Sequence, residues 1–159
     1  MKAIKNGKSE ESSWLHLADE PIPPHGPVTV SLERWLRDKA ELLTRDGSVG
    51  VRLTTTDSVE GLVNDLPALE LIVLEMATFT DGRAFSQARL LRERFSYEGE
   101  IRAWGDFLRD QMFFLNRVGV NAFEFPDDTP LDDRLKAFNE FSVTYQTAAD
   151  SLQPLYRRR

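Results

Sequence analysis

Apolar and polar positions follow a repeating order along the chain after Pro27. Short apolar segments, typical of strands, alternate with longer segments whose apolar positions recur at helical spacing. In the helix expected after Asp81, for example, Phe85, Ala88 and Leu91 fall on one face. The predicted strands cover 28–32, 49–53, 69–76, 100–104 and 121–125, and the predicted helices cover 33–43, 58–66, 86–95, 106–119 and 131–146.

These five βα units predict an α/β fold with a mainly parallel sheet and right-handed crossovers. With 159 residues the chain is too short for a barrel of eight units. The sheet is therefore expected to be open and three-layered or half-barrel-like, and a partner subunit is one way to close it. Ahead of these units, Asn6-Gly7 predicts a small N-terminal β-hairpin.

One domain is expected from this length. Residues 1–27 hold the hairpin and a loop with four prolines, and they are expected to be part of the same domain as the βα repeats of 28–153. Residues 154–159 form a basic tail.

Four predicted strands carry one charged residue between apolar neighbours, and the sign of the charge alternates: Arg52, Glu75, Arg102 and Glu124. Because side chains alternate between the two faces of a sheet, we expect one apolar face and one face that carries these charges. If the strands are neighbours in chain order, the charges form a row of opposite-sign pairs. Otherwise they line a barrel-like cavity or lie at the strand ends, and the sequence leaves these alternatives open.

Composition narrows the classes of partner. The net charge of −6 disfavours a nucleic acid bound mainly through its phosphates. No apolar stretch has the length of a membrane span, and the first residues lack the apolar core of a signal peptide. We therefore expect no nucleic acid, no membrane and a cytoplasmic location, with a homo-oligomer left open.

The sequence contains no cysteine and two histidines. Disulfides, thiol catalysis and cysteine-bound zinc are therefore excluded, and no metal site is predicted. The glycine-rich motifs of dinucleotide and P-loop binding are also missing. No cofactor is predicted, although a flavin is left open, and any redox chemistry would need a cofactor or a partner to carry the electrons.

The carboxyl ends of the predicted strands are rich in Asp, Thr and Arg, and ligands of parallel α/β folds bind at this edge. Helix capping is the simpler explanation for many of these residues. Asp81-Gly82-Arg83 is more distinctive, because glycine allows a tight backbone and Arg83 adds a cation where a helix start already favours an anion. A small oxyanion or a partner's carboxylate would suit this corner, and so would an internal Asp81–Arg109 or Arg83–Asp106 ion pair. The candidate binding residues are Glu75, Asp81, Gly82, Arg83, Ser86, Gln87, Arg89, Asp106, Arg109, Asp110 and Gln111, and the catalytic residues, if any, are unknown.

The predicted helix 106–119 suggests an interface. By their spacing, Asp106, Asp110 and Phe113 share one polar face. We therefore expect Phe113 at the surface, where an aromatic side chain is typical of a protein interface, and Phe114 in the core.

Three motifs carry a resemblance to a known family: FTDGRAFSQARLLR (Phe79–Arg92), GDFLRDQ (Gly105–Gln111) and FSVTY (Phe141–Tyr145). Together with VTVSLERWL and VGVRL they resemble an uncharacterised bacterial family of about this length, and the resemblance covers nearly the whole chain. Members of that family are often labelled probable oxidoreductase. Their genes commonly lie beside the gene of the haemoprotein subunit of assimilatory sulfite reductase.

The resemblance implies a role in sulfur metabolism, in sulfate assimilation at or near the reduction of sulfite. A chain without cysteine or a dinucleotide motif is a poor electron carrier. We therefore expect an accessory protein that docks onto sulfite reductase or assists it, with the haemoprotein subunit as candidate partner. The alternative is a small enzyme or binding protein whose strand-end Asp, Arg and Gln residues form a pocket for an anionic metabolite. Convergence of these residues on a concave pocket would favour the alternative, and their dispersal into internal ion pairs would favour docking.

Overall fold

One sheet of eight strands organises the described part of the chain, residues 1–126 and 128–139 of a computed structural model. Six strands pair in chain order, each parallel to the next. They are β3 (Leu15–His16), β4 (Val28–Ser31), β5 (Val49–Leu53), β6 (Leu71–Met76), β7 (Glu100–Gly105) and β8 (Ala122–Phe125). All five predicted strands are present, whereas the two-residue β3 was not predicted.

A β-hairpin completes the sheet. β1 (Lys2–Lys5) pairs antiparallel with both β2 (Lys8–Glu11) and β8. The turn residues Asn6 and Gly7 have φ values of 50° and 78°, as a tight hairpin turn requires, so the predicted hairpin is confirmed. The α/β class and the half-barrel-like alternative are also confirmed. The sheet is mixed rather than mainly parallel, because the hairpin folds back and adds two antiparallel pairings.

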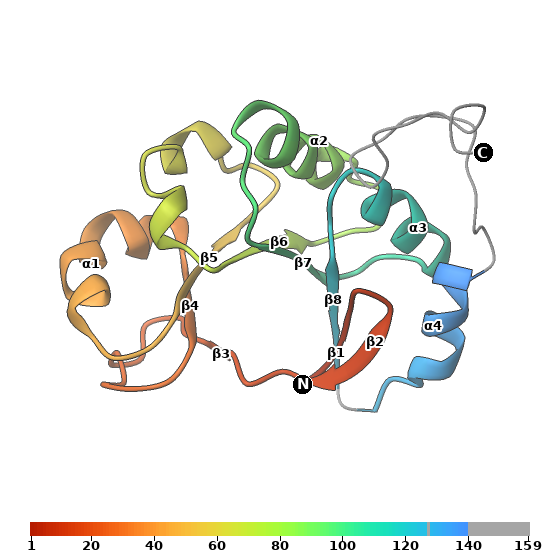
Figure 1. The fold of residues 1–159 in the computed structure, drawn as a ribbon, viewed down its shortest axis with the longest axis horizontal. Helices are drawn as coiled ribbons and strands as arrows, with labels where there is room; N and C mark the ends of the chain where they lie inside the picture. Colours follow the sequence, from red (N-terminus) through yellow and green to blue (C-terminus); the bar gives the residue numbers. More distant parts are fainter. Residues whose placement is uncertain (127, 140–159) are drawn as a thin grey trace.

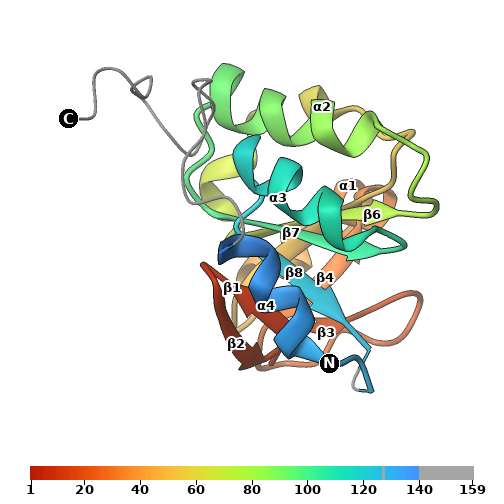
Figure 2. The ribbon, with the colours of Figure 1, turned by 90° about the vertical axis from the view of Figure 1, so that its right-hand side faces the viewer.

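Three helices lie along one face of the curled sheet: α1 (Leu32–Thr44), α2 (Arg83–Arg89) and α3 (Arg109–Arg117) (Figures 1 and 2). α2 continues as a π-helical turn over Leu90–Arg94, and α4 (Leu131–Asn139) packs against α3. Among the described helices, none is long and apolar enough to cross a membrane.

Two of the predicted helices differ from the structure. Residues 58–66 form a 3-10 turn over Val59–Leu62, followed by a second over Leu66–Ala68, since a glycine and a proline interrupt the segment. The predicted helix 106–119 begins only at Arg109, where the Gln111 side chain accepts a hydrogen bond from the backbone N–H of Leu108 (2.9 Å). Residues 140–146 of the last predicted helix, the FSVTY motif and the basic tail lie outside the described residues.

The hydrophobic core lies between the sheet and the helices. In the row that the strand register brings together, Ile72 lies between Val51 and Ile101, and all three are fully buried. On the helix side the largest buried side chain is Trp35, whose indole N–H donates to Asp65 (2.9 Å). This apolar face leaves the opposite face of the sheet to the charged residues, as the alternation along the strands predicts.

Gly50 is required where β5 and β6 pair most closely. A Cβ at this position would lie 2.6 Å from the backbone oxygen of Leu71 and 2.9 Å from its Cβ. We expect Gly50→Ala to lower the free energy of unfolding in urea by roughly 1–3 kcal/mol, because neither atom belongs to a flexible side-chain end. Gly61→Ala is the matched control, since nothing lies within 4 Å of a Cβ there. Equal stability of the two variants would contradict this close approach.

Candidate functional site

The charged face of the sheet carries ion pairs between neighbouring strands. Arg52 Nε donates to Glu75 Oε1 (2.9 Å), and Arg102 Nη1 donates to Glu124 Oε2 (2.5 Å). Arg102 also pairs with Glu100 on its own strand. The four strand charges therefore form opposite-sign pairs, the first of the alternatives that the sequence left open.

His16 joins the two ion pairs across the concave side of the sheet. Its Nε2 lies 2.7 Å from Glu124 Oε1, and its Nδ1 lies 2.6 Å from Thr29 Oγ1. Thr29 Oγ1 in turn accepts a hydrogen bond from Arg52 Nη1 (2.9 Å). His16 of β3 thus contacts Glu124 of β8, although four strands, β4 to β7, lie between them in the sheet. This polar network lies on the concave side of the sheet.

Sequence reasoning missed His16 as part of this network. The signal is present, because His16 lies between Leu15 and Leu17 and repeats the pattern of one polar residue between apolar neighbours. The segment is only two residues long as a strand, which is too short for a periodicity argument.

Glu124 is held as a carboxylate at the centre of the network, where its side chain is 0% exposed. Burial alone would raise the pKa of Glu124. The hydrogen bonds and positive charges of His16 and Arg102 outweigh burial, and the pKa lies below its ordinary value of 4.5.

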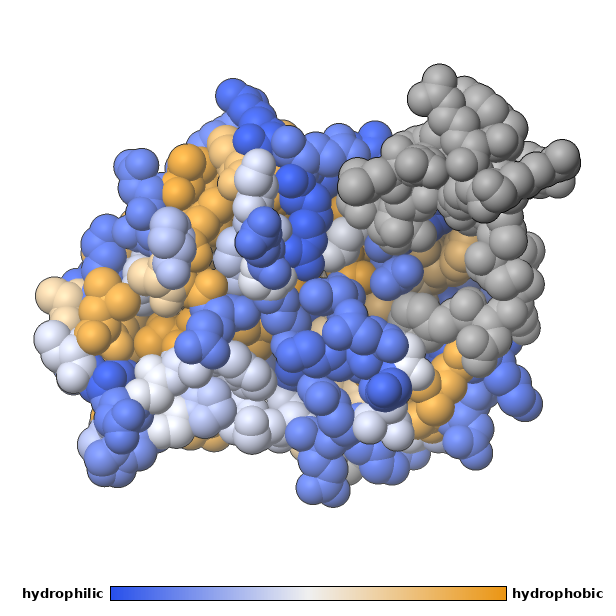
Figure 3. Space-filling model, in the orientation of Figure 1, coloured by the Kyte–Doolittle hydropathy of each residue, from blue (hydrophilic) through white to orange (hydrophobic). Residues whose placement is uncertain are grey.

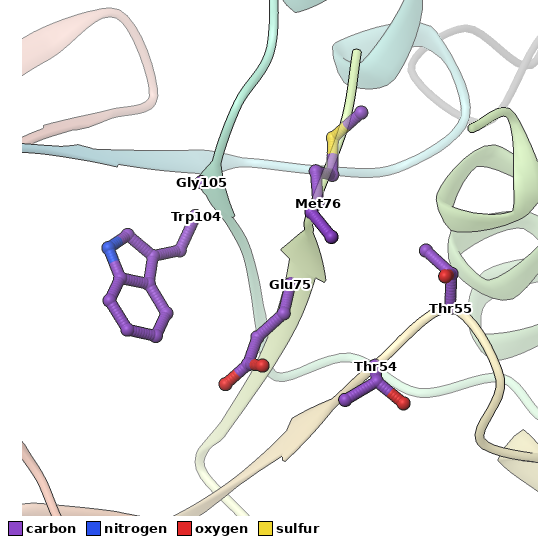
Figure 4. A pocket seen from close by; sticks show the side chains of 7 residues that line it. Thr54, Thr55, Glu75, Met76, Trp104 and Gly105 are labelled. Carbon is purple, nitrogen blue, oxygen red and sulfur yellow. The ribbon is translucent and has the colours of Figure 1, made fainter. Parts of the chain in front are cut away.

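A pocket of about 200 Å³ opens at the carboxyl ends of three strands. Figure 4 shows Glu75 at the end of β6, with Trp104 of β7 on one side and Thr54, which follows β5, on the other. The Trp104 ring stacks on the His16 ring, with 5.1 Å between ring centroids and 18° between their planes. The lining residues are Thr54, Thr55, Glu75, Met76, Ala77, Trp104 and Gly105.

Asp81 and Arg83, the most distinctive of the predicted site residues, bind each other. Arg83 Nη2 donates to Asp81 Oδ2 (2.7 Å), and the backbone N–H of Arg83 donates to Asp81 Oδ1 (3.0 Å). These hydrogen bonds hold the pKa of Asp81 far below its ordinary value. The Asp81 carboxylate pairs within its own loop rather than with Arg109, and Arg83 does not pair with Asp106.

Gln87 and Gln111 position the loops around the pocket. The buried Gln87 donates its Nε2 to the backbone oxygens of Thr54 (2.8 Å) and Asp57 (3.1 Å). Gln111 Nε2 donates to the backbone oxygen of Phe79 (2.7 Å). The two amides therefore fix the loops that follow β5 and β6.

The remaining predicted residues do not line this pocket. Arg109 contacts Asp133 and so joins α3 to α4. The backbone N–H of Asp106 donates to Met76 (2.7 Å), which ties the loops after β6 and β7 together. Of the predicted set, Glu75 alone lines the pocket, and the exposed members are Gly82, Arg83, Ser86, Arg89, Asp106 and Asp110. In residues 1–126 and 128–139, no group of three or more His, Asp or Glu residues is arranged to hold a metal ion.

Two apolar side chains are exposed on the loops beside the pocket. Phe79 is 43% exposed on the loop after β6, and Leu108 is 49% exposed just before α3. Figure 2 shows the loops after β6 and β7 extending together beyond the sheet. On α3 the prediction was wrong in phase: Phe114 is 52% exposed, whereas Phe113 is half-buried, because Met112 and Leu115 form the buried face of the helix.

Comparison with protein families gives one match. The model of a family described as a bacterial protein of unknown function (DUF934) matches residues 50–156. Comparisons with curated proteins and with solved structures give no match.

Removal of the Glu124 charge tests the buried network. We expect Glu124→Gln to lower the free energy of unfolding by about 3 kcal/mol near neutral pH, since Arg102 and His16 lose a buried partner. Glu10→Gln is the matched control, because Glu10 is 44% exposed and only 3.9 Å from the same arginine. Its effect should stay within about 0.5 kcal/mol.

The same pair of proteins gives a pH test. The folded-state pKa of Glu124 is lowered, so its contribution is full above the ordinary value of 4.5 and is lost as the pH falls below it. The stability difference between wild type and Glu124→Gln should therefore shrink in urea unfolding as the pH is lowered to about 3. A difference that stays constant over this range would mean that folding leaves the pKa of Glu124 unshifted, and a difference that grows would mean that the folded protein holds Glu124 protonated.

Proposed function

We propose that this chain, which belongs to the DUF934 family of bacterial proteins, is an accessory protein of assimilatory sulfite reduction that docks onto sulfite reductase. The sequence resemblance supports the place in sulfur metabolism. The carboxyl edge of the sheet supports docking as the mode of action, and it is the face that would meet the haemoprotein subunit.

The observation that carries the docking proposal is the exposed pair Phe79 and Leu108. Gln111 holds both loops at once, because it donates to the Phe79 oxygen and accepts from the Leu108 N–H. Exposed apolar side chains on fixed backbone are typical of the centres of protein interfaces. Both residues lie on loops that begin at residues lining the pocket, Ala77 and Gly105, so the same edge carries a concave pocket and exposed apolar side chains.

The polar residues of this edge also favour docking over the alternative of an anion-binding enzyme. Arg83 is bound to Asp81, and Arg52 is bound to Glu75. The charged group that lines the pocket is a carboxylate, which offers an anionic metabolite no hydrogen-bond donor. The arginines that would clamp an anion are thus held in internal ion pairs.

The composition supports an assisting role rather than electron transfer by the chain alone. The sequence has no cysteine that could act as a redox thiol. Its net charge of −6 would speed the approach to a basic surface on the partner.

Substitution of the apolar pair tests the proposal. Wild-type protein should bind purified sulfite reductase haemoprotein subunit in isothermal titration calorimetry. The double variant Phe79→Ser, Leu108→Ser should bind at least about tenfold more weakly, because hot-spot side chains each contribute more than ~1 kcal/mol.

The control lies on another face of the molecule. Leu36 and Leu43 on α1 are 54% and 51% exposed, and Figure 3 shows apolar surface in the region of α1. Leu36→Ser with Leu43→Ser should leave the affinity unchanged. Equal weakening by both double variants would argue against the carboxyl edge, and no binding by wild type would reject docking to this subunit.

A further inference from the structure

The pocket beside Phe79 and Leu108 has one charged lining group, the carboxylate of Glu75. Its Oε1 accepts from Arg52 Nε (2.9 Å), and its Oε2 has no partner among the described residues. The side chain is 30% exposed, so this second oxygen is within reach of a ligand. Glu75 thus offers an ionised acceptor at the pocket.

Arg52 fixes this carboxylate through only one of its two oxygens. Its Nη1 donates to the backbone oxygen and hydroxyl of Thr29, and its Nη2 donates to the backbone oxygen of Leu17 (2.7 Å). Because these hydrogen bonds hold the guanidinium on the inner side of the sheet, it cannot turn to cover the second oxygen of Glu75. The acceptor is therefore oriented before any ligand arrives.

The other walls of the pocket are aromatic or apolar. Trp104 lies directly beside Glu75 in the strand register, and its ring is held by stacking on His16. The exposed Ala77 adds apolar surface. An aromatic face beside a carboxylate is the combination that binds organic cations, through cation–π attraction and a charge-assisted hydrogen bond.

The size of the pocket narrows the ligand further. At about 200 Å³ it is smaller than the usual range for pockets of drug-sized ligands, roughly 300–1,000 Å³. A single long side chain with an apolar stem and a cationic end matches both the volume and the walls. No Lys or Arg of the described residues lines the pocket, so none of them fills it.

We propose that the pocket receives an arginine or lysine side chain of the partner protein, with the cation on Glu75 and the stem against the Trp104 ring. This inference rests on the proposed docking function and names the chemistry that the partner must present. A partner that packs on Phe79 and Leu108 would cover the inserted side chain, which excludes water from the ion pair and strengthens it.

The direct test uses a small probe in place of the partner. Nα-acetyl-arginine amide is titrated into isotope-labelled full-length protein, and the indole N–H signal of Trp104 is followed by NMR and assigned with Trp104→Phe. We expect a saturable shift. Nα-acetyl-citrulline amide, the neutral isostere, should bind about tenfold more weakly, because it lacks the charge-assisted hydrogen bond.

Two variants test the role of Glu75. Glu75→Gln should remove the preference for arginine over citrulline, and Glu41→Gln, an exposed carboxylate on α1, should retain it. Because Glu75→Gln also unpairs Arg52, Ala77→Arg serves as a second variant. Ala77 is exposed, so the added guanidinium can occupy the pocket without loss of a buried contact, and it should block the probe. Equal shifts with both probes, or no saturable shift in folded wild-type protein, would overturn the inference.

The reductase-binding measurement separates this inference from the proposed function. If the haemoprotein subunit binds while the pocket does not distinguish arginine from citrulline, the pocket inference fails and the docking proposal stands. If the pocket selects arginine while the subunit does not bind, the docking proposal fails and the cation pocket stands.

Discussion

The buried hydrogen bond between His16 and Glu124 is the contact on which the shape of this protein depends. It joins residues 108 positions apart in the chain, and it brings the first parallel strand against the last. Glu124 is fully buried and would be costly without partners. Its ion pair with Arg102 of the neighbouring strand and its hydrogen bond with His16 offset that cost, and the contact with His16 requires the sheet to curl.

The same network positions the candidate site. His16 stacks on the Trp104 ring, and Arg52 orients the Glu75 carboxylate. The aromatic and the charged side chain of the pocket are therefore both held by residues on the concave side of the sheet. Gln87 and Gln111 hold the loops from the helix side. The carboxyl edge is therefore a preformed surface, and binding there would lose little conformational entropy.

Much of this structure can be predicted from the order of apolar and polar residues along the chain. The rest depends on contacts between residues that are distant in sequence. The five βα units, the hairpin turn at Asn6-Gly7 and the charge pairs Arg52–Glu75 and Arg102–Glu124 follow from periodicity and chain order. The role of His16 does not, because β3 is two residues long and its partner is distant in sequence. The exposed face of α3 depends on which of its residues pack on the core, and Met112 and Leu115 do so rather than Phe114. The sequence Asp81-Gly82-Arg83 fits an anion-binding site as well as an internal ion pair. Only the structure shows that Asp81 and Arg83 bind each other.

Growth of a deletion strain tests most directly whether the protein acts at sulfite reduction. The gene is removed from a bacterium that makes its own cysteine, and growth is compared on sulfate, sulfite, sulfide and cysteine as sole sulfur source. A protein that assists sulfite reductase predicts growth on sulfide and cysteine, with growth on sulfate and sulfite lost or slowed and restored by the wild-type gene. Normal growth of the deletion strain on all four sources would contradict this account.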